Sequence, residues 1–289
     1  MTQQADAAGE RRSSGGALQA LAASPPTLSP RRLLAAVGRP PLTLLRRLAL
    51  AAGLGAAVLA AAAQAATWRR PVRREFVRAM LDVGVHAVRA TAVVGVLVGL
   101  AMVYQALYWL QAAGQTDLFG RVLVLVLVRE IAPLLAGLII VGRSGLPMLI
   151  YLEELRAGGQ LRMLEAQGID PFLLLVVPRI LAFAASCFCL AILLLTMALL
   201  VGYFSGHAVG AVEISFYAFF DTVLRAMGPG TYLLLPVKTA AIGFAVGVTC
   251  ALPVLATAGE SEVGKLTAGG FVQACLAVFI VSGAVSVML

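Results

Sequence analysis

The stretch that decides the fold is FLLLVVPRILAFAASCFCLAILLLTMALLV, residues 172–201, in which Arg179 is the only charged side chain. At about 1.5 Å of rise per residue, a helix of this length crosses the roughly 30 Å hydrocarbon core of a bilayer. The stretch lacks the apolar and polar alternation of a membrane barrel strand. Further long apolar runs occupy residues 91–110, 121–142, 231–256 and 268–289. We therefore predict an all-α integral membrane fold with five transmembrane helices.

Composition leads to the same fold class. Hydrophobic residues make up 61% of the chain and charged residues 12%, and the mean hydropathy is +0.94. A water-soluble fold could not bury that much apolar surface. The formal net charge is +8, but twelve of the 22 Lys and Arg residues precede residue 79. Cytoplasmic anchoring and anionic lipid headgroups account for basic residues placed there, so we expect no nucleic-acid partner.

The amino-terminal part divides into two segments. Residues 1–30 are rich in Ala, Ser, Gly and Pro without a signal-peptide core, which predicts a disordered cytoplasmic tail. Residues 31–78 form a basic, helical, interfacial region, and residues 79–289 the membrane domain. Within the basic region, the Ala-rich run 48–66 lies between two arginine clusters, one of which would have to cross the membrane if the run spanned it. We favour a helix lying in the interface, and a true span remains the alternative.

Loop charge sets the expected topology. The segment 142–171 is the longest polar interruption between spans and contains three arginines and four acidic residues, so it should face the cytoplasm together with the amino terminus. Residues 111–120 and 206–230 should then face the other side.

Besides Arg179, three charged residues stand inside apolar runs. Arg129 and Glu130 interrupt the run 122–140, and Lys238 lies near the start of the run 231–256. Isolated charges are costly in a bilayer, which makes Lys238 the obvious partner of Glu130. Two interpretations stay open: a structural network that neutralises these charges, or a polar cavity that meets lipid headgroups and transmits movement.

The segment 142–171 also contains leucines at helical spacing, with polar side chains on the other faces and Gly158-Gly159 interrupting the pattern. This pattern predicts a short amphipathic helix at the cytoplasmic surface that docks a cytosolic partner. The candidate contact residues are Glu153, Glu154, Arg156, Gln160 and Arg162.

Other chemistry has little support in the sequence. Gly259–Lys265 fits the phosphate-binding pattern GxxxxGK, but Leu266 stands where a Mg²⁺-binding hydroxyl belongs and the segment joins two membrane helices. The chain has only two histidines, and its four cysteines lie inside apolar runs. We therefore expect no metal site, no cofactor and no catalytic constellation.

Several short motifs resemble those of the MlaE/YrbE permease family, in the family's order and spacing. They are Arg129-Glu130-Ile-Ala-Pro133, Gly142-Arg143-Ser-Gly145, Gly168-Ile-Asp170-Pro171 and Val177-Pro178-Arg179. The residues that carry the resemblance are Pro133, Gly142, Arg143, Gly145, Asp170, Pro171, Pro178 and Arg179. The sequence departs from the family at Ile150-Tyr151 and Gly158-Gly159, where the family usually carries glutamates.

The resemblance implies an amino-terminal interfacial helix, five membrane helices and a coupling helix between the second and third. It also implies a function: the permease subunit of an ABC-type lipid transporter in a bacterial inner membrane, with phospholipid as the favoured cargo. Its expected partners are a separate cytosolic ATPase that hydrolyses the ATP, an MCE-domain protein, membrane lipids and a second permease, identical or not. The alternatives are a non-transporting membrane scaffold for an MCE protein and a stand-alone secondary carrier.

Overall fold

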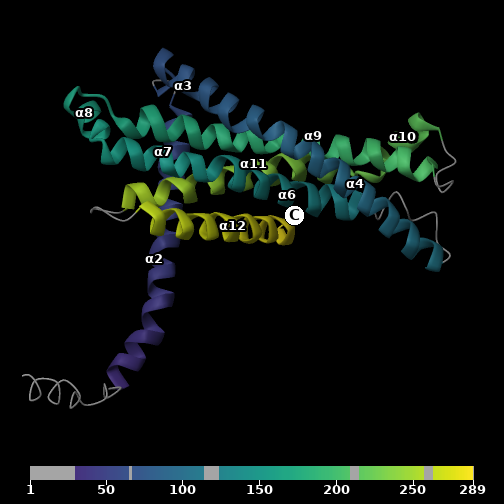
Figure 1. Cartoon of the computed structure of the whole chain (residues 1–289), viewed down its shortest axis with the longest axis horizontal. Helices are drawn as coiled ribbons and strands as arrows, with labels where there is room; N and C mark the ends of the chain where they lie inside the picture. The colour runs from purple at the N-terminus through teal and green to yellow at the C-terminus, as the bar shows by residue number, and fades with distance from the viewer. Residues whose placement is uncertain (1–29, 65–66, 114–123, 209–214, 257–262, 289) are drawn as a thin grey trace, which may run out of the picture. The chain divides into compact units, whose positions relative to one another are not determined.

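The computed structural model describes residues 30–64, 67–113, 124–208, 215–256 and 263–288, and every regular element in these ranges is a helix (Figure 1). The chain forms two compact units, Met1–Ala49 and Leu50–Leu289. The predicted tail lies outside the described residues, apart from Pro30, which opens helix α2 (Pro30–Ala63).

Six helical stretches in the described part of the chain are long and apolar enough to cross a membrane. They are Arg46–Ala63, Arg70–Met102, Val126–Ala157, Phe172–Ala208, Gly230–Leu255 and Gly269–Met288. The all-α, multi-span class is therefore confirmed. The first stretch is the Ala-rich run, whose length and composition suit a span; its placement in the interface stays a prediction.

The first helix of the membrane domain begins earlier than the hydropathy suggests. The apolar run begins only at residue 91, but one helical segment runs through α3 (Arg70–Met80), the π-helical turn η2 (Leu81–Val85) and α4 (His86–Ala113). Pro71 suits the first turn of a helix, and no glycine or second proline follows before Gly84. The basic stretch is therefore the polar beginning of a long helix.

The segment after the second apolar run also differs from expectation. A continuous helical path passes through η4 (Val124–Ile131), α6 (Ala132–Ile140), η5 (Val141–Gly145) and α7 (Leu146–Ala157). The amphipathic element is thus the end of a membrane helix, followed by the separate helix α8 (Gln160–Ala166). Gly159, at φ +70°, makes the break between them, because a left-handed conformation strains any residue with a side chain.

Three of the π-helical turns are followed by proline. Pro133, Pro147 and Pro178 each lie two residues after the end of η4, η5 and η6 (Phe172–Val176). A proline inside a helix removes one hydrogen-bond donor and collides with the preceding turn, so the helix must widen or kink there. These wider turns lie next to most of the polar side chains described below.

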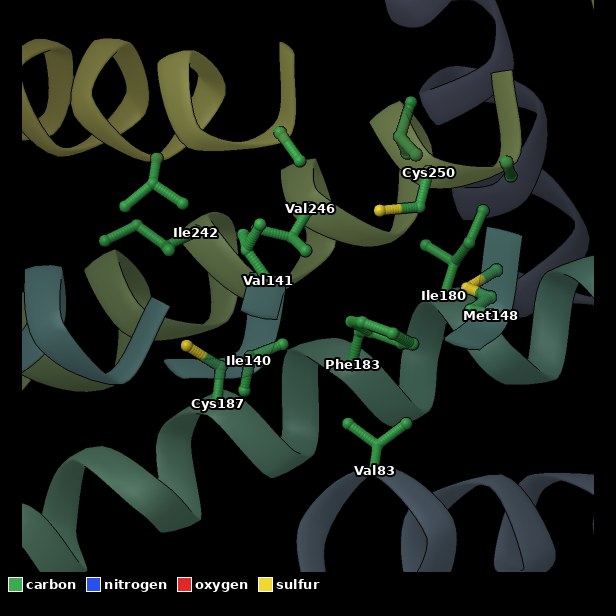
Figure 2. Packing of buried hydrophobic residues seen from close by; sticks show 14 of the residues in the cluster. Val83, Ile140, Val141, Met148, Ile180, Phe183, Cys187, Ile242, Val246 and Cys250 are labelled. Atoms are coloured by element: carbon green, nitrogen blue, oxygen red, sulfur yellow. The ribbon is translucent and has the colours of Figure 1, made fainter. Parts of the chain in front are cut away.

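The helix α9 (Val177–Ala208) is the centre of the 50–289 unit. It contacts α4 on one side and α11 (Pro229–Ala256) on the other, and α12 (Val263–Met288) covers α11 (Figure 1). Figure 2 shows the buried cluster in which Phe183 and Ile180 meet Ile140, Val141 and Val246. Glycines allow the close contacts: a Cβ at Gly99 would lie 2.4 Å from the carbonyl oxygen of Ala198.

The two ends of this unit carry different elements. The amphipathic helix α8 lies at one end and α10 (Phe216–Ala226) at the other (Figure 1). Ser215 caps α10 through a bond that its hydroxyl accepts from the Ala218 amide. The helix α8 from the segment 142–171 and the helix α10 from the segment 206–230, which we expected on opposite sides of the membrane, are therefore far apart.

Candidate functional site

Glu130 and Lys238 belong to one hydrogen-bond network within the membrane helices. Lys238 Nζ, from α11, donates to Glu130 Oε2 at 2.9 Å, to the Arg129 carbonyl oxygen at 2.7 Å and to Ser286 Oγ at 2.5 Å. The Ser286 hydroxyl donates in turn to Glu130 Oε1 at 2.7 Å. The network joins η4, α11 and α12, and the contact between Glu130 and Lys238 that the sequence suggested is present in it.

The members of this network differ in how much of each side chain is exposed. The Lys238 side chain is 0% exposed and that of Glu130 is 44% exposed. An ammonium group has three protons to donate, and all three are used here, so Lys238 has none left for a ligand. Arg129 is half-buried, and among the described residues no hydrogen-bond acceptor pairs with its guanidinium. Arg129 and Glu130 are therefore the members able to meet another molecule, whereas Lys238 fixes their position.

Ser286 was not anticipated from the sequence. A serine in an apolar helix is common, and its hydroxyl often bonds within its own helix. Only the packing of α12 against α11 shows that this hydroxyl bridges the two charged side chains.

The predicted partner-docking residues do not all face outward. Glu154, Gln160 and Arg162 are exposed, but Glu153 is buried, with 8% of its surface exposed. Arg156 Nη1 donates to the Val254 carbonyl oxygen at 2.6 Å. The prediction that Glu153 is a contact residue at the surface is therefore wrong, and Arg156 is half-buried, with one of its donors engaged by α11.

The reason lies in helical spacing. Leu149, Leu152, Glu153 and Arg156 fall on one face of α7, and that face packs against α11 and α12. Val254 belongs to the last turn of α11, where carbonyl groups lack partners inside the helix. Arg156 supplies a donor to one of them, as basic side chains at helix ends commonly do.

Several of the motif residues shape the helices. Pro133 and Pro178 are buried after π-helical turns, and Gly145 lets α11 approach, since a Cβ there would lie 3.1 Å from Cys250 Sγ. The Asp170 carboxylate accepts a hydrogen bond at 2.9 Å from the Phe172 amide, at the helix start where Pro171 is the cap residue.

The remaining motif residues gather where α3, η5 and α9 meet. Arg179 Nη2 lies 3.0 Å from Glu75 Oε1, and its guanidinium carbon lies 3.9 Å from the centre of the Tyr151 ring. Arg143 follows the exposed Gly142 and donates through Nε to the His86 carbonyl oxygen at 3.4 Å. Sequence reasoning missed Glu75 and Tyr151, because no spacing along the chain connects them to Arg179.

Neither cluster resembles a metal centre. Within the described ranges, no three metal-ligating side chains come together. The phosphate-loop-like stretch Gly259–Lys265 lies mostly outside the described residues, which resume at Val263 in α12.

Comparison with known proteins agrees with the motifs. Among curated proteins, the chain is 25% identical over 207 residues to a probable ABC transporter permease protein of Rickettsia prowazekii, covering 71% of this chain and 78% of the relative. It is 28% identical over 186 residues to the chloroplastic protein TRIGALACTOSYLDIACYLGLYCEROL 1 of Arabidopsis thaliana, covering 63% and 52%. It is 27% identical over 142 residues to the intermembrane phospholipid transport system permease protein MlaE of Haemophilus influenzae, covering 48% and 53%.

The match to the family itself is longer. Residues 76–288, which include both polar clusters except for Glu75, match the family described as Permease MlaE. With its apolar helices and buried charge network, the chain is a multi-pass membrane protein that belongs to the MlaE permease family.

Proposed function

We propose that this permease carries phospholipid across or out of a bacterial inner membrane, with Arg129 and Glu130 lining the path of the lipid headgroup. The Haemophilus relative is named as a phospholipid transport permease, which supports the choice of cargo. In this proposal the amino terminus is cytoplasmic, ATP is hydrolysed by a separate ATPase chain, and an MCE-domain protein exchanges lipid with the permease.

The observation that carries the proposal is the unequal burial in the charge network. Lys238 is sealed inside the protein, whereas the Glu130 carboxylate reaches the surface of a membrane-spanning helix. A half-exposed carboxylate that faced hydrocarbon would be costly, so a polar cavity should cover it. A second permease copy, identical or related, would close such a cavity. The Arg129 guanidinium then suits a lipid phosphate, which it can bind with two parallel hydrogen bonds.

The segment 142–171, which we call the coupling segment, is connected to both Glu130 and Lys238 of the network. The helical path from η4 to α7 contains Glu130, and Arg156 of α7 holds the end of α11, the helix of Lys238. A push on α7 by an ATPase would therefore reach Glu130 and Lys238 through different helices. The exposed Glu154, Gln160 and Arg162 are the candidate contacts with the ATPase, as in amphipathic helices that dock into grooves.

Lipid transfer from proteoliposomes tests the site. The permease is reconstituted with the ATPase that co-purifies with it, and Arg129→Gln is compared with Arg129→Lys and with Arg225→Gln. Arg225 is a matched control because its exposed side chain pairs with Asp221 in α10. We expect Arg129→Gln to abolish ATP-driven transfer, Arg129→Lys to retain part of it and the control to retain all of it. Full transfer by Arg129→Gln would contradict the proposed role.

Co-purification from native membranes separates the proposal from its alternatives. An ATPase together with an MCE-domain protein supports the transporter. An MCE-domain protein without ATPase indicates the scaffold, and neither partner indicates a secondary carrier.

Accessible-cysteine labelling tests the orientation. A cysteine replacing the exposed Arg162 should react only in permeabilised cells, and one replacing Tyr217, 84% exposed in α10, should react in intact cells. The reverse pattern would overturn the topology.

A further inference from the structure

A cavity with several charged side chains in its lining lies at the end of the helices next to the coupling segment, away from Arg129 and Glu130. It has a volume of about 610 Å³, within the usual range for small-molecule sites. We call it the junction cavity. Its walls come from α3, η2, α4, η5, α7 and α9, and its charged lining residues include Glu75, Arg78, Asp82, Arg143 and Arg179.

The lining divides into an apolar floor and a charged mouth. The floor contains the buried side chains of Val83, Met148 and Phe183. Arg143 and Arg78 are exposed at the mouth, the Arg78 side chain by 75%. The exposed Asp82 also lines the cavity, but the three arginines Arg78, Arg143 and Arg179 outnumber the carboxylates of Glu75 and Asp82. A cavity with an apolar floor and a net positive charge in its lining suits an amphiphile that carries negative charge.

The arginines are engaged to different degrees. Arg179 is held between Glu75 and the Tyr151 ring, with 12% of its side chain exposed. Arg78 lies 3.8 Å from the same Glu75 carboxylate, and Arg143 makes one long bond to a carbonyl oxygen. Arg78 and Arg143 therefore keep most of their donors for a ligand, whereas Arg179 and Glu75 brace the wall.

The helical segment of α3 and η2 is polar on the side that lines the junction cavity and apolar on the opposite side. Its opposite face, with Val77, Met80, Leu81 and Val85, lines an apolar groove of about 290 Å³ against α9. Residues that alternate in this way along a helix mark a position at the boundary between hydrocarbon and headgroups. The mouth of the junction cavity should therefore lie at the depth of lipid phosphates.

From these observations we propose that the junction cavity binds the phosphate of a glycerophospholipid from the leaflet next to the coupling segment. Arg143 and Arg78 hold the phosphate, because guanidinium groups match phosphate oxygens with paired hydrogen bonds. The glycerol and the first carbons of the acyl chains lie on the floor. The proposal rests on the proposed function for the class of cargo, but it needs neither transport nor an ATPase.

The site also touches the coupling element. Pro147, Met148 and Tyr151 of α7 line the cavity, and Tyr151 lies on Arg179. A lipid bound here contacts the helix that the proposed function assigns to the ATPase, so occupancy of the cavity can bias its position.

Native mass spectrometry of the full-length chain in detergent tests the proposal. Phosphatidylglycerol, diacylglycerol with the same acyl chains and soluble glycerol phosphate are the probes. Arg143→Gln and Arg78→Gln are compared with Arg225→Gln, an exposed arginine of α10 outside the cavity. We expect each of the first two variants to weaken phosphatidylglycerol binding about tenfold, the size of one charge-assisted hydrogen bond. The control should bind as wild type does, and diacylglycerol should show no dependence on Arg143.

Three results would overturn the site. They are unchanged phosphatidylglycerol binding in both variants, equal losses for diacylglycerol, and displacement of the lipid by glycerol phosphate, which would indicate a soluble phosphate ligand. Thermal unfolding checks that each variant folds. If Arg143→Gln is unstable, the binding result for Arg78→Gln decides, because Arg78 is exposed.

A photoactivatable phospholipid locates the binding. A reactive group beside the phosphate should label peptides from α3 or α7 in wild type and in Arg129→Gln. Labelling confined to η4 would contradict the junction cavity. Retained labelling in an Arg129→Gln variant with normal transfer would instead contradict the proposed function alone.

Discussion

Glu130→Gln should destabilise the protein more than Lys238→Met, although each removes one charge from the same pair. Lys238 is 0% exposed, so loss of its counter-ion leaves an ammonium group sealed in an apolar interior. Removing one partner from a buried ion pair costs about 3–5 kcal/mol. Glu130 is 44% exposed, so the carboxylate left by Lys238→Met keeps part of its solvation.

The free energy of unfolding that is lost in Lys238→Met follows from the hydrogen bonds that Lys238 makes. Three bonds from Nζ disappear. Bonds between membrane helices average about 0.6 kcal/mol, which gives about 2 kcal/mol in total. The double variant Glu130→Gln/Lys238→Met removes both charges, and it should be at least about 1 kcal/mol more stable than Glu130→Gln alone, because an apolar replacement for a buried pair is often neutral.

Reversible unfolding in mixed micelles, titrated with SDS, measures all three differences. Equal losses in the two single variants, or additive losses in the double variant, would refute the assignment of Lys238 as the buried partner. The charge-swapped variant Glu130→Lys/Lys238→Glu should recover little stability. A glutamate at position 238 cannot donate to the Arg129 carbonyl oxygen, and a lysine at position 130 would lie beside Arg129. Substantial recovery would show that charge alone, and not this hydrogen-bond geometry, holds the network.

Three further outcomes are expected. Arg156→Ala should lower stability by about 1.5 kcal/mol through loss of a charge-assisted hydrogen bond, and it should reduce the amount of lipid transferred per ATP hydrolysed. Arg162→Ala should leave stability unchanged. Unfolding measurements test the stability of both variants, and coupled transport assays test the transfer. Gly159→Ala should cost about 1 kcal/mol because its φ is +70°, and Gly142→Ala, with open space around the added Cβ, should cost nothing; equal melting temperatures would contradict this. Gly99→Ala should cost about 1–3 kcal/mol in thermal unfolding, because the new Cβ meets the backbone of α9 at 2.4 Å. A melting temperature equal to that of wild type would show that α4 and α9 are less closely packed.

The sequence predicted the fold class because the preference for hydrocarbon is a property of consecutive residues. The run 172–201 is apolar whatever surrounds it, and it forms the central helix of the membrane domain. The presence of charges at Arg129, Glu130 and Lys238 was also legible, since any ionisable group inside such a run needs a partner. The bend at Gly158-Gly159 followed from the poor helix propensity of glycine.

Tertiary packing decided which side chains meet. Lys238 and Glu130 are 108 residues apart, and Arg179 and Glu75 are 104 apart. Whether such residues touch depends on the rotation of each helix about its axis, which is fixed by close contacts such as those at Gly99 and Gly145. The same rotation turned Glu153 and Arg156 inward, although they resemble their exposed neighbours in the sequence. Hydropathy places a residue in the membrane, but the packing of helix against helix determines what that residue faces.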